Sequence, residues 1–193
     1  MPLPERRLPH LYVIGQPFFV TFRLYASLPK NRPFRSATMT TGQAFVAMDR
    51  LLDNARTGPM FLKQPEIAQV VLESLERGAQ LGHYTQHAFV IMSNHVHLLL
   101  TPHISVPKLL GSLKSATAKR ANQLLHRAGQ PFWQDESYNH LVRDAAEFRK
   151  IRQYIENNPV RAGLATHPEH YRYSSARGAE SPAQPERLPH SVL

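Results

Sequence analysis

The chain has no cysteine among its 193 residues, and this absence removes several kinds of chemistry at once. Without thiols there is no disulfide, no thiolate metal site and no cysteine nucleophile, and we expect a cytoplasmic protein. No run of about 18 apolar residues occurs either, so the sequence predicts no membrane span. The segment MPLPERRLPH, residues 1–10, lacks an apolar stretch of signal-peptide length, and we expect no export.

Acidic residues are scarce, because 14 Asp and Glu stand against 23 Lys and Arg. The formal net charge is +9, the isoelectric point is near 10.2, and most of the basic residues are arginine. Guanidinium groups pair with phosphates through two hydrogen bonds and release condensed counterions, so the composition favours a polyanionic partner, with nucleic acid first. The alternative is a basic surface that serves only solubility.

The length predicts one domain with a buried core. Both ends are rich in proline and poor in large apolar residues, which is typical of weakly ordered arms. We therefore expect an N-terminal basic arm over residues 1–16, a single domain over residues 17–175 and a C-terminal tail over residues 176–193.

Apolar periodicity within the expected domain predicts strands and helices in the order β, α, α, β, β, α, β, α. This order predicts an α+β fold, an antiparallel sheet with helices packed mainly on one face, and a ferredoxin-like variant would satisfy it. The last helix is expected to end before Pro159, which cannot donate a backbone hydrogen bond. The predicted strands are residues 17–25, 84–92, 95–101 and 137–143, and the predicted helices are residues 41–57, 65–81, 106–127 and 145–158.

Two histidines, His95 and His97, stand one residue apart in the apolar stretch FVIMSNHVHLLLTP, residues 89–102. Alternate side chains of a strand share a face, so both imidazoles can reach one ion while Val96, Leu98 and Leu100 face the helices. Nitrogen and oxygen donors suit Mg²⁺, Mn²⁺ or Zn²⁺, and imidazole favours the last two. A third ligand must come from elsewhere. The alternative is a pair of partly exposed histidines without a metal.

A tyrosine and an asparagine, Tyr154 and Asn158, lie one turn apart on the last predicted helix. A phenol can attack phosphorus as a covalent nucleophile, and a cation beside the phosphate would polarise it. Tyrosine, metal and a basic surface together indicate phosphoryl transfer. The alternative is a tyrosine that only packs its ring, and spacing alone does not select Tyr154 from the seven tyrosines.

Three blocks of the chain, in this order and spacing, resemble the one-tyrosine HUH transposases, and the REP-associated tyrosine transposases in particular. They are NHVHLLL at residues 94–100, FWQDESYNHLVRD at residues 132–144 and QYIENNPVRAGL at residues 153–164. A Leu-Pro-His segment followed by an FFVTFRL strand, within residues 8–24, also resembles the start of that family. The resemblance covers roughly residues 6–176.

This resemblance implies a ferredoxin-like HUH endonuclease fold that acts on single-stranded DNA at palindromic, REP-like hairpins. It implies that His95, His97 and Asn158 hold a divalent metal, Mg²⁺ or Mn²⁺, and that Tyr154 is the nucleophile. Attack by Tyr154 would leave a 5′-phosphotyrosine and a free 3′-hydroxyl that can reverse the reaction. Relatives work as monomers or homodimers, and we expect one of these states in the cytoplasm, at the nucleoid.

DNA binding is expected to use basic residues against the phosphate backbone. The helix predicted over residues 106–127 carries a polar stripe, which is either a phosphate-binding face or a solvated surface: Lys108, Ser112, Ser115, Lys119 and Asn122. We expect Lys108, Lys119, Arg120 and Arg161 to bind DNA. Phe132 and Trp133 either stack on bases or pack in the core.

Two other functions remain open from the sequence. The chain could be a domesticated DNA-binding or regulatory protein of the same fold that does not cleave DNA. It could also be a metal-dependent hydrolase that uses activated water, which would cleave DNA without a protein-linked product.

Overall fold

The computed structural model describes residues 13–28, 41–55 and 58–177. Most of the expected N-terminal arm and C-terminal tail lie outside these residues. No helix in the described part of the chain combines the length and apolar character needed to cross a bilayer. The described elements occur in the predicted order: β1 (Phe18–Arg23), α1 (Thr41–Asp53), η2 (Phe61–Lys63), α2 (Pro65–Gln80), β2 (Tyr84–Ile91), β3 (His95–Pro102), α3 (Val106–Leu124), β4 (Tyr138–Leu141), α4 (Ala145–Arg161) and η3 (Pro168–His170).

The strands form a four-stranded sheet in the order β2-β3-β1-β4, and every neighbouring pair is antiparallel. The segment between β1 and β2 contains α2, and the segment between β3 and β4 contains α3. These two helices pack on the same face of the sheet, which is the ferredoxin-like arrangement. The predicted α+β class with an antiparallel sheet is therefore confirmed.

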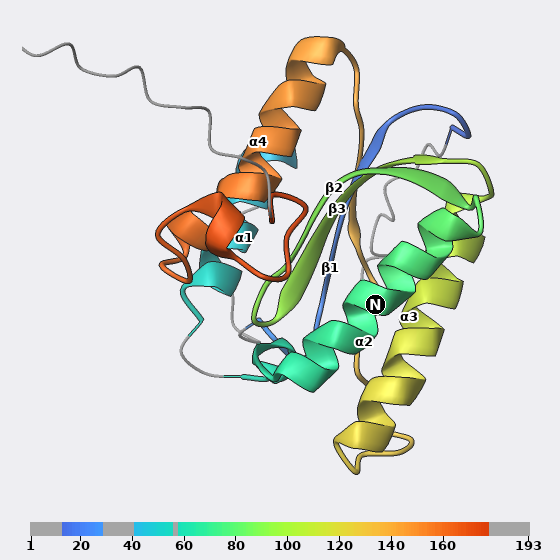
Figure 1. Ribbon diagram of the computed structural model, residues 1–193, viewed down its shortest axis with the longest axis vertical. Coiled ribbons are helices and arrows are strands. Elements are labelled where there is room, and N and C mark those ends of the chain that lie inside the picture. The colour runs from blue at the N-terminus through green and yellow to red at the C-terminus, as the bar shows by residue number, and fades with distance from the viewer. Residues whose placement is uncertain (1–12, 29–40, 56–57, 178–193) are drawn as a thin grey trace, which may run out of the picture.

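The sheet has a hydrophobic core on each face. Val96 and Leu98 of β3 face α2 and α3, whereas Leu99 belongs to a second core that includes Phe45 of α1 and Ile155 of α4. Figure 1 shows α2 and α3 on one side of the strands and α1 and α4 on the other. The expectation that helices lie mainly on one face is corrected in this respect, because the second face of the sheet is also apolar and has to be covered.

Helix α4 continues beyond the residue at which it was expected to stop. It begins at Asp144, whose carboxylate accepts a hydrogen bond from a backbone N–H of the first turn, and it passes through Pro159 to Arg161. The helix ends where Gly163 takes a φ of +70° and the Leu164 N–H donates to the Pro159 carbonyl oxygen at 2.8 Å. The proline thus lies in the final turns, and the residues before it keep their helical positions.

A close contact between α2 and β2 gives a first prediction. We expect Gly78→Ala to lower the free energy of unfolding by about 1–3 kcal/mol, the usual cost of overpacking. A Cβ at residue 78 would lie 2.7 Å from Cε1 of Tyr84, a buried ring whose hydroxyl donates to the Leu75 carbonyl oxygen. Gly111 of α3 is the control, because a Cβ there meets nothing within 4 Å. Gly111→Ala should raise the free energy of unfolding by about 1 kcal/mol. Equal shifts of the urea unfolding midpoint in the two variants would contradict the prediction.

Candidate active site

Strand β3 places the two histidine rings side by side beneath α1 and α4. The Nε2 atoms of His95 and His97 lie 3.1 Å apart, and both side chains are fully buried at 0% exposure. The rings share a face, as strand alternation predicts, while Val96 packs on the other side of the sheet. The alternative of two partly exposed histidines is therefore wrong.

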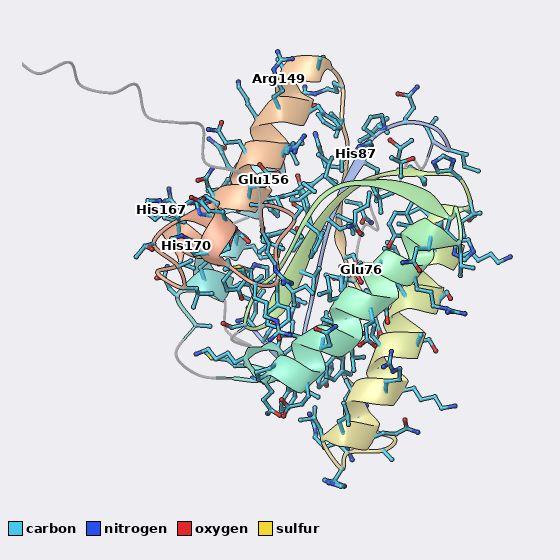
Figure 2. All side chains as sticks on the ribbon, in the orientation of Figure 1. Glu76, His87, Arg149, Glu156, His167 and His170 are labelled. Carbon is cyan, nitrogen blue, oxygen red and sulfur yellow. The ribbon has the colours of Figure 1, made fainter. Side chains whose placement is uncertain are left out.

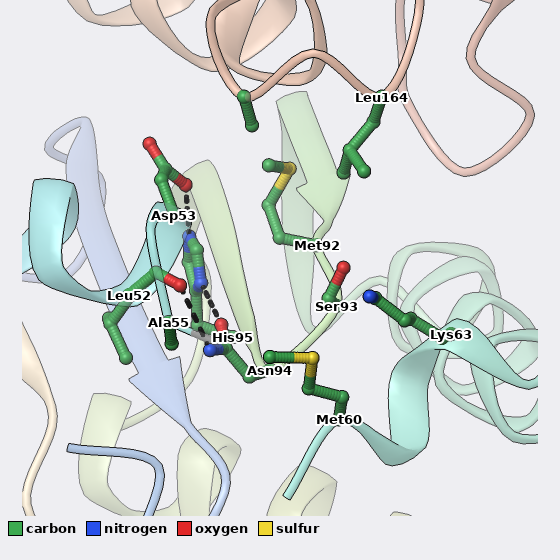
Figure 3. A pocket seen from close by; sticks show the side chains of 11 residues that line it. Leu52, Asp53, Ala55, Met60, Lys63, Met92, Ser93, Asn94, His95 and Leu164 are labelled. Atoms are coloured by element: carbon green, nitrogen blue, oxygen red, sulfur yellow. Dashed lines mark hydrogen bonds and ion pairs between the residues drawn. The ribbon is translucent and has the colours of Figure 1, made fainter. Parts of the chain in front are cut away.

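Hydrogen bonds to the Nδ1 atoms of His95 and His97 orient the two imidazoles. Asn94 donates from Nδ2 to the Leu52 carbonyl oxygen at 3.0 Å, which turns its Oδ1 toward His95 Nδ1 at 2.7 Å (Figure 3). Because Oδ1 only accepts hydrogen bonds, His95 Nδ1 carries the proton and Nε2 has a free lone pair. Burial lowers the pKa of His95 to about 3, so this ring is neutral at pH 7. The hydroxyl of Thr21 lies 2.7 Å from His97 Nδ1 and orients that ring.

Asp49 of α1 is a buried member of the site that the sequence analysis missed. Its Oδ1 lies 3.0 Å from His97 Nε2 and 3.4 Å from His95 Nε2, and its side chain is fully buried. Burial acts to raise the pKa of Asp49, but attraction and hydrogen bonding to His97 outweigh burial and lower it to about 2. The carboxylate is therefore ionised at neutral pH. One signal was present: Asp49 lies one turn after Phe45 on the apolar face of α1.

Helix α4 brings the predicted tyrosine and asparagine to the same point. The Tyr154 hydroxyl donates to Asp49 Oδ2. The Asn158 Nδ2 atom lies 3.3 Å from His97 Nε2 and 3.3 Å from Asp49 Oδ2. The structure thus brings His95, His97, Tyr154 and Asn158 together, although these residues come from a strand and a helix that are separated by α3 and β4.

The donor atoms at this point fit a divalent metal. Donor atoms of Asp49, His95 and His97 all lie within 4.8 Å of one another. Within the described residues, the Oδ1 atoms of Asp53 and Asn158 are buried without a hydrogen-bond partner, which is costly unless a cation compensates them. Two imidazole nitrogens with carboxylate and amide oxygens suit Mn²⁺, Mg²⁺ or Zn²⁺. Exchange of the amide nitrogen and oxygen of Asn158 by rotation would present its oxygen to such an ion.

A second acidic residue of α1, Asp53, stands at the edge of the histidine pair (Figure 3). Its Oδ1 lies 3.9 Å from His95 Nε2. Burial, helped by the negative charge of Asp49, raises the pKa of Asp53 to about 7. The site therefore concentrates two carboxyl groups beside two imidazoles in a space largely closed to water.

The basic residues expected to bind DNA fall into two groups. The guanidinium of Arg161 lies 4.8 Å from the centre of the Tyr154 ring and so belongs to the site. Lys108, Lys119 and Arg120 are exposed on α3, on the opposite face of the sheet, and Arg120 bonds Glu73 of α2 at 2.8 Å. In Figure 2, Arg149 marks α4 and Glu76 marks α2, the helices that pack on opposite faces of the sheet.

Phe132 and Trp133 pack in the core beneath α3. They are 2% and 6% exposed, and Trp133 donates from Nε1 to the Thr117 hydroxyl at 2.8 Å. Core packing is therefore the correct one of the two interpretations for both rings.

Residues 60–158 match the family model of the IS200-like transposases. The chain belongs to this family. The matched span contains both histidines, Tyr154 and Asn158, and it excludes Asp49, which precedes it. The resemblance noted from the three sequence blocks is thereby confirmed.

Two solved structures are similar to this IS200-like transposase. A REP-associated tyrosine transposase bound to a REP hairpin has 17% sequence identity and a TM-score of 0.49, with 89% of this chain and 82% of that chain covered. A candidate transposase from Deinococcus radiodurans R1 has 19% identity and a TM-score of 0.42, with 76% and 93% covered. None of the curated proteins compared with the chain matches it.

Proposed function

We propose that the chain is a metal-dependent, site-specific endonuclease and strand transferase of single-stranded DNA, acting at palindromic hairpins through a 5′-phosphotyrosine. One observation carries this proposal. The Tyr154 hydroxyl bonds the same carboxylate, Asp49, whose other oxygen approaches both histidines. A nucleophile and a set of metal donors therefore meet at one side chain, as phosphoryl transfer by tyrosine requires.

His95, His97 and Asp49, with Asn158 after rotation of its amide, would hold a divalent metal, Mg²⁺ or Mn²⁺. When bound, the metal supplies positive charge that polarises the scissile phosphate. Asp49 orients the Tyr154 phenol through Oδ2, and the phenol proton passes to water as the oxygen attacks phosphorus. A bond forms between Tyr154 Oη and phosphorus while the bond from phosphorus to the 3′ oxygen breaks, and that oxygen leaves as a hydroxyl after protonation by water.

The reaction can run backwards without ATP, because the tyrosine ester keeps the phosphodiester bond energy. A 3′-hydroxyl that attacks the phosphotyrosine restores a DNA strand and releases Tyr154 with its proton. Cleavage at one hairpin and joining at another then make a strand transfer. The single domain over residues 17–175 would carry both steps.

The DNA partner is supported by the net charge of +9 and by the family. We propose that Arg161, beside the Tyr154 ring, contacts the cleaved strand. We propose that Lys108, Lys119 and Arg120, which lie on α3 across the sheet, contact another part of the hairpin. The proposed enzyme acts as a monomer or homodimer at the nucleoid.

A covalent-adduct assay tests the proposal. Purified protein is incubated with Mn²⁺ or Mg²⁺ and hairpin oligonucleotides made from palindromes that flank its gene, and the products are separated under denaturing conditions. We expect cut DNA with a protein-linked fragment, mapped by mass spectrometry to Tyr154, and no product after addition of a chelator. Cleavage without linked protein would favour the water-using hydrolase. Hairpin binding without cleavage, unchanged by chelator, would favour the domesticated binding protein.

A further inference from the structure

A cavity of about 640 Å³ lies beside Tyr154, between α1, β4 and α4. Its volume is in the range of ligand pockets, about 300–1,000 Å³. Tyr154 itself forms part of the wall, so the opening lies beside the residue proposed to attack the phosphate. The residues that shape it are Phe45, Tyr138, Arg143, Lys150, Ile151 and Tyr154.

The inner wall of the cavity is aromatic. The rings of Phe45 and Tyr138 stack with centroids 4.3 Å apart and planes at 29°. Phe19 and Tyr154 meet Phe45 edge-on, with centroids 5.3 and 5.9 Å away. Val46, which is 37% exposed, adds an apolar group at the mouth. Because Phe45 and Phe19 are only 7% and 3% exposed, the half-buried Tyr138 ring is the one on which a flat aromatic guest can stack.

The rim of the cavity is basic. Glu147 is its acidic member, but it accepts hydrogen bonds from Arg143 at 2.8 Å and from His140 at 3.0 Å. Hydrogen bonding to Arg143 is the main reason why the pKa of Glu147 falls to about 2, and its negative charge is balanced locally. Lys150 is exposed, and no ion pair joins it to another residue of the described chain. The rim thus attracts a group with negative charge beside the aromatic wall.

A second cavity at the histidines is too small for the same guest. It measures about 170 Å³ and is lined by Asp53, Asn94 and His95, together with Met92 and Lys63 (Figure 3). Its polar wall and small volume suit water molecules. Of the two openings at the histidines and Tyr154, the aromatic cavity is therefore the one that can hold a nucleotide.

We propose that the aromatic cavity binds the unstacked base of the nucleotide that flanks the phosphate attacked by Tyr154, while Lys150 at the rim contacts the adjoining phosphate. This inference rests on the proposed function and names where the substrate strand lies. A single strand loses base stacking when it bends into the site, and the half-buried Tyr138 ring, backed by Phe45, supplies a replacement surface. His140 and the Glu147–Arg143 pair stand where the base edge would lie, so the cavity would also contribute to sequence preference.

Photochemical cross-linking tests the cavity without requiring cleavage. Hairpin oligonucleotides with a thymidine-rich single-stranded flank carry one iododeoxyuridine, moved base by base along the flank. This base cross-links to aromatic side chains that it touches. We expect cross-links to Tyr138 from one or two adjacent positions, located by mass spectrometry of the peptides. Bound DNA that does not cross-link to Tyr138 from any position would overturn the inference.

A variant that fills the cavity provides a second measurement. Val46→Trp places a large ring at the mouth without removing a buried group, and we expect it to reduce these cross-links at least about fivefold by competing for the space. Leu124→Trp is the matched control, because Leu124 is 52% exposed at the end of α3, on the opposite face. Equal loss of cross-linking in both variants, or no loss in either, would contradict the proposal that the cavity binds a base.

The outcomes separate this inference from the proposed function. A Tyr154 adduct without cross-links to the cavity would leave the transferase standing and overturn the cavity. Cross-links at Tyr138 without an adduct would support the cavity and overturn the transferase. A protein that binds none of the oligonucleotides would overturn both.

Discussion

The Tyr154→Phe protein is expected to lose covalent adduct formation by at least about a thousandfold, since the substitution removes the hydroxyl proposed to form the tyrosine ester. The ring contacts with Phe45, His97 and Arg161 do not involve the hydroxyl and are kept. Asp49 Oδ2 retains the Asn158 amide at 3.3 Å after the hydroxyl is gone. The fold should therefore change little, by about 1 kcal/mol in the free energy of unfolding.

The measurement is single-turnover formation of the protein-linked DNA, followed on denaturing gels beside hairpin binding by the same protein. Tyr171→Phe is the matched control, because Tyr171 packs on the same core and its hydroxyl donates to the Ile91 carbonyl oxygen at 2.9 Å. We expect the control to form adduct at close to the normal rate. An adduct that persists in Tyr154→Phe would show that another residue is the nucleophile.

Asp49→Asn is expected to weaken Mn²⁺ binding by about 10–100-fold or more, because it keeps the shape of the side chain and removes its charge. The Oδ1 atom at this position stands 3.0 Å from His97 Nε2 and 3.4 Å from His95 Nε2. An amide there can turn an N–H toward the imidazoles and satisfy them without a cation. Titration calorimetry or the electron paramagnetic resonance of free Mn²⁺ measures the affinity with no DNA present.

Asp53→Asn is the control for the same helix and the same chemical change. Its Oδ1 lies farther out, 3.9 Å from His95 Nε2, so we expect a smaller loss of Mn²⁺ affinity. An Asp49→Asn protein that binds Mn²⁺ as tightly as the unaltered chain would remove Asp49 from the metal site. A larger loss in Asp53→Asn would place the ion nearer to the second carboxyl group.

The strands and helices could be predicted from the sequence because their signals are local. Alternation in β3 placed Val96 and Leu98 on one face and the histidines on the other, and the structure agrees. The packing of helices on the second face of the sheet could not be predicted from such local signals. Phe19 and Leu99 show that this face is apolar, but which helix covers it depends on contacts between distant segments. The predicted end of α4 before Pro159 was wrong, because the helix continues through Pro159 to Arg161. Gly163, with its positive φ, then closes the last turn.

The site was only partly predictable. His95, His97, Tyr154 and Asn158 follow from motif and resemblance, and the structure brings them together. Asp49 was not predicted, because no sequence pattern relates an aspartate in α1 to the histidines of a strand much later in the chain. Its position on an apolar face was the available clue, since a buried carboxylate needs a partner.

Strand β3 is a boundary between two compartments of the molecule. On one side, Val96 and Leu98 belong to the hydrophobic core and are constrained by volume. On the other, His95 and His97 are constrained by the direction of their lone pairs and by the identity of their neighbours. Adjacent residues of β3 are therefore under different physical constraints. Substitutions in α1 and α4 can change the surroundings of the two histidines without changing the hydrophobic core on the other face of the strand.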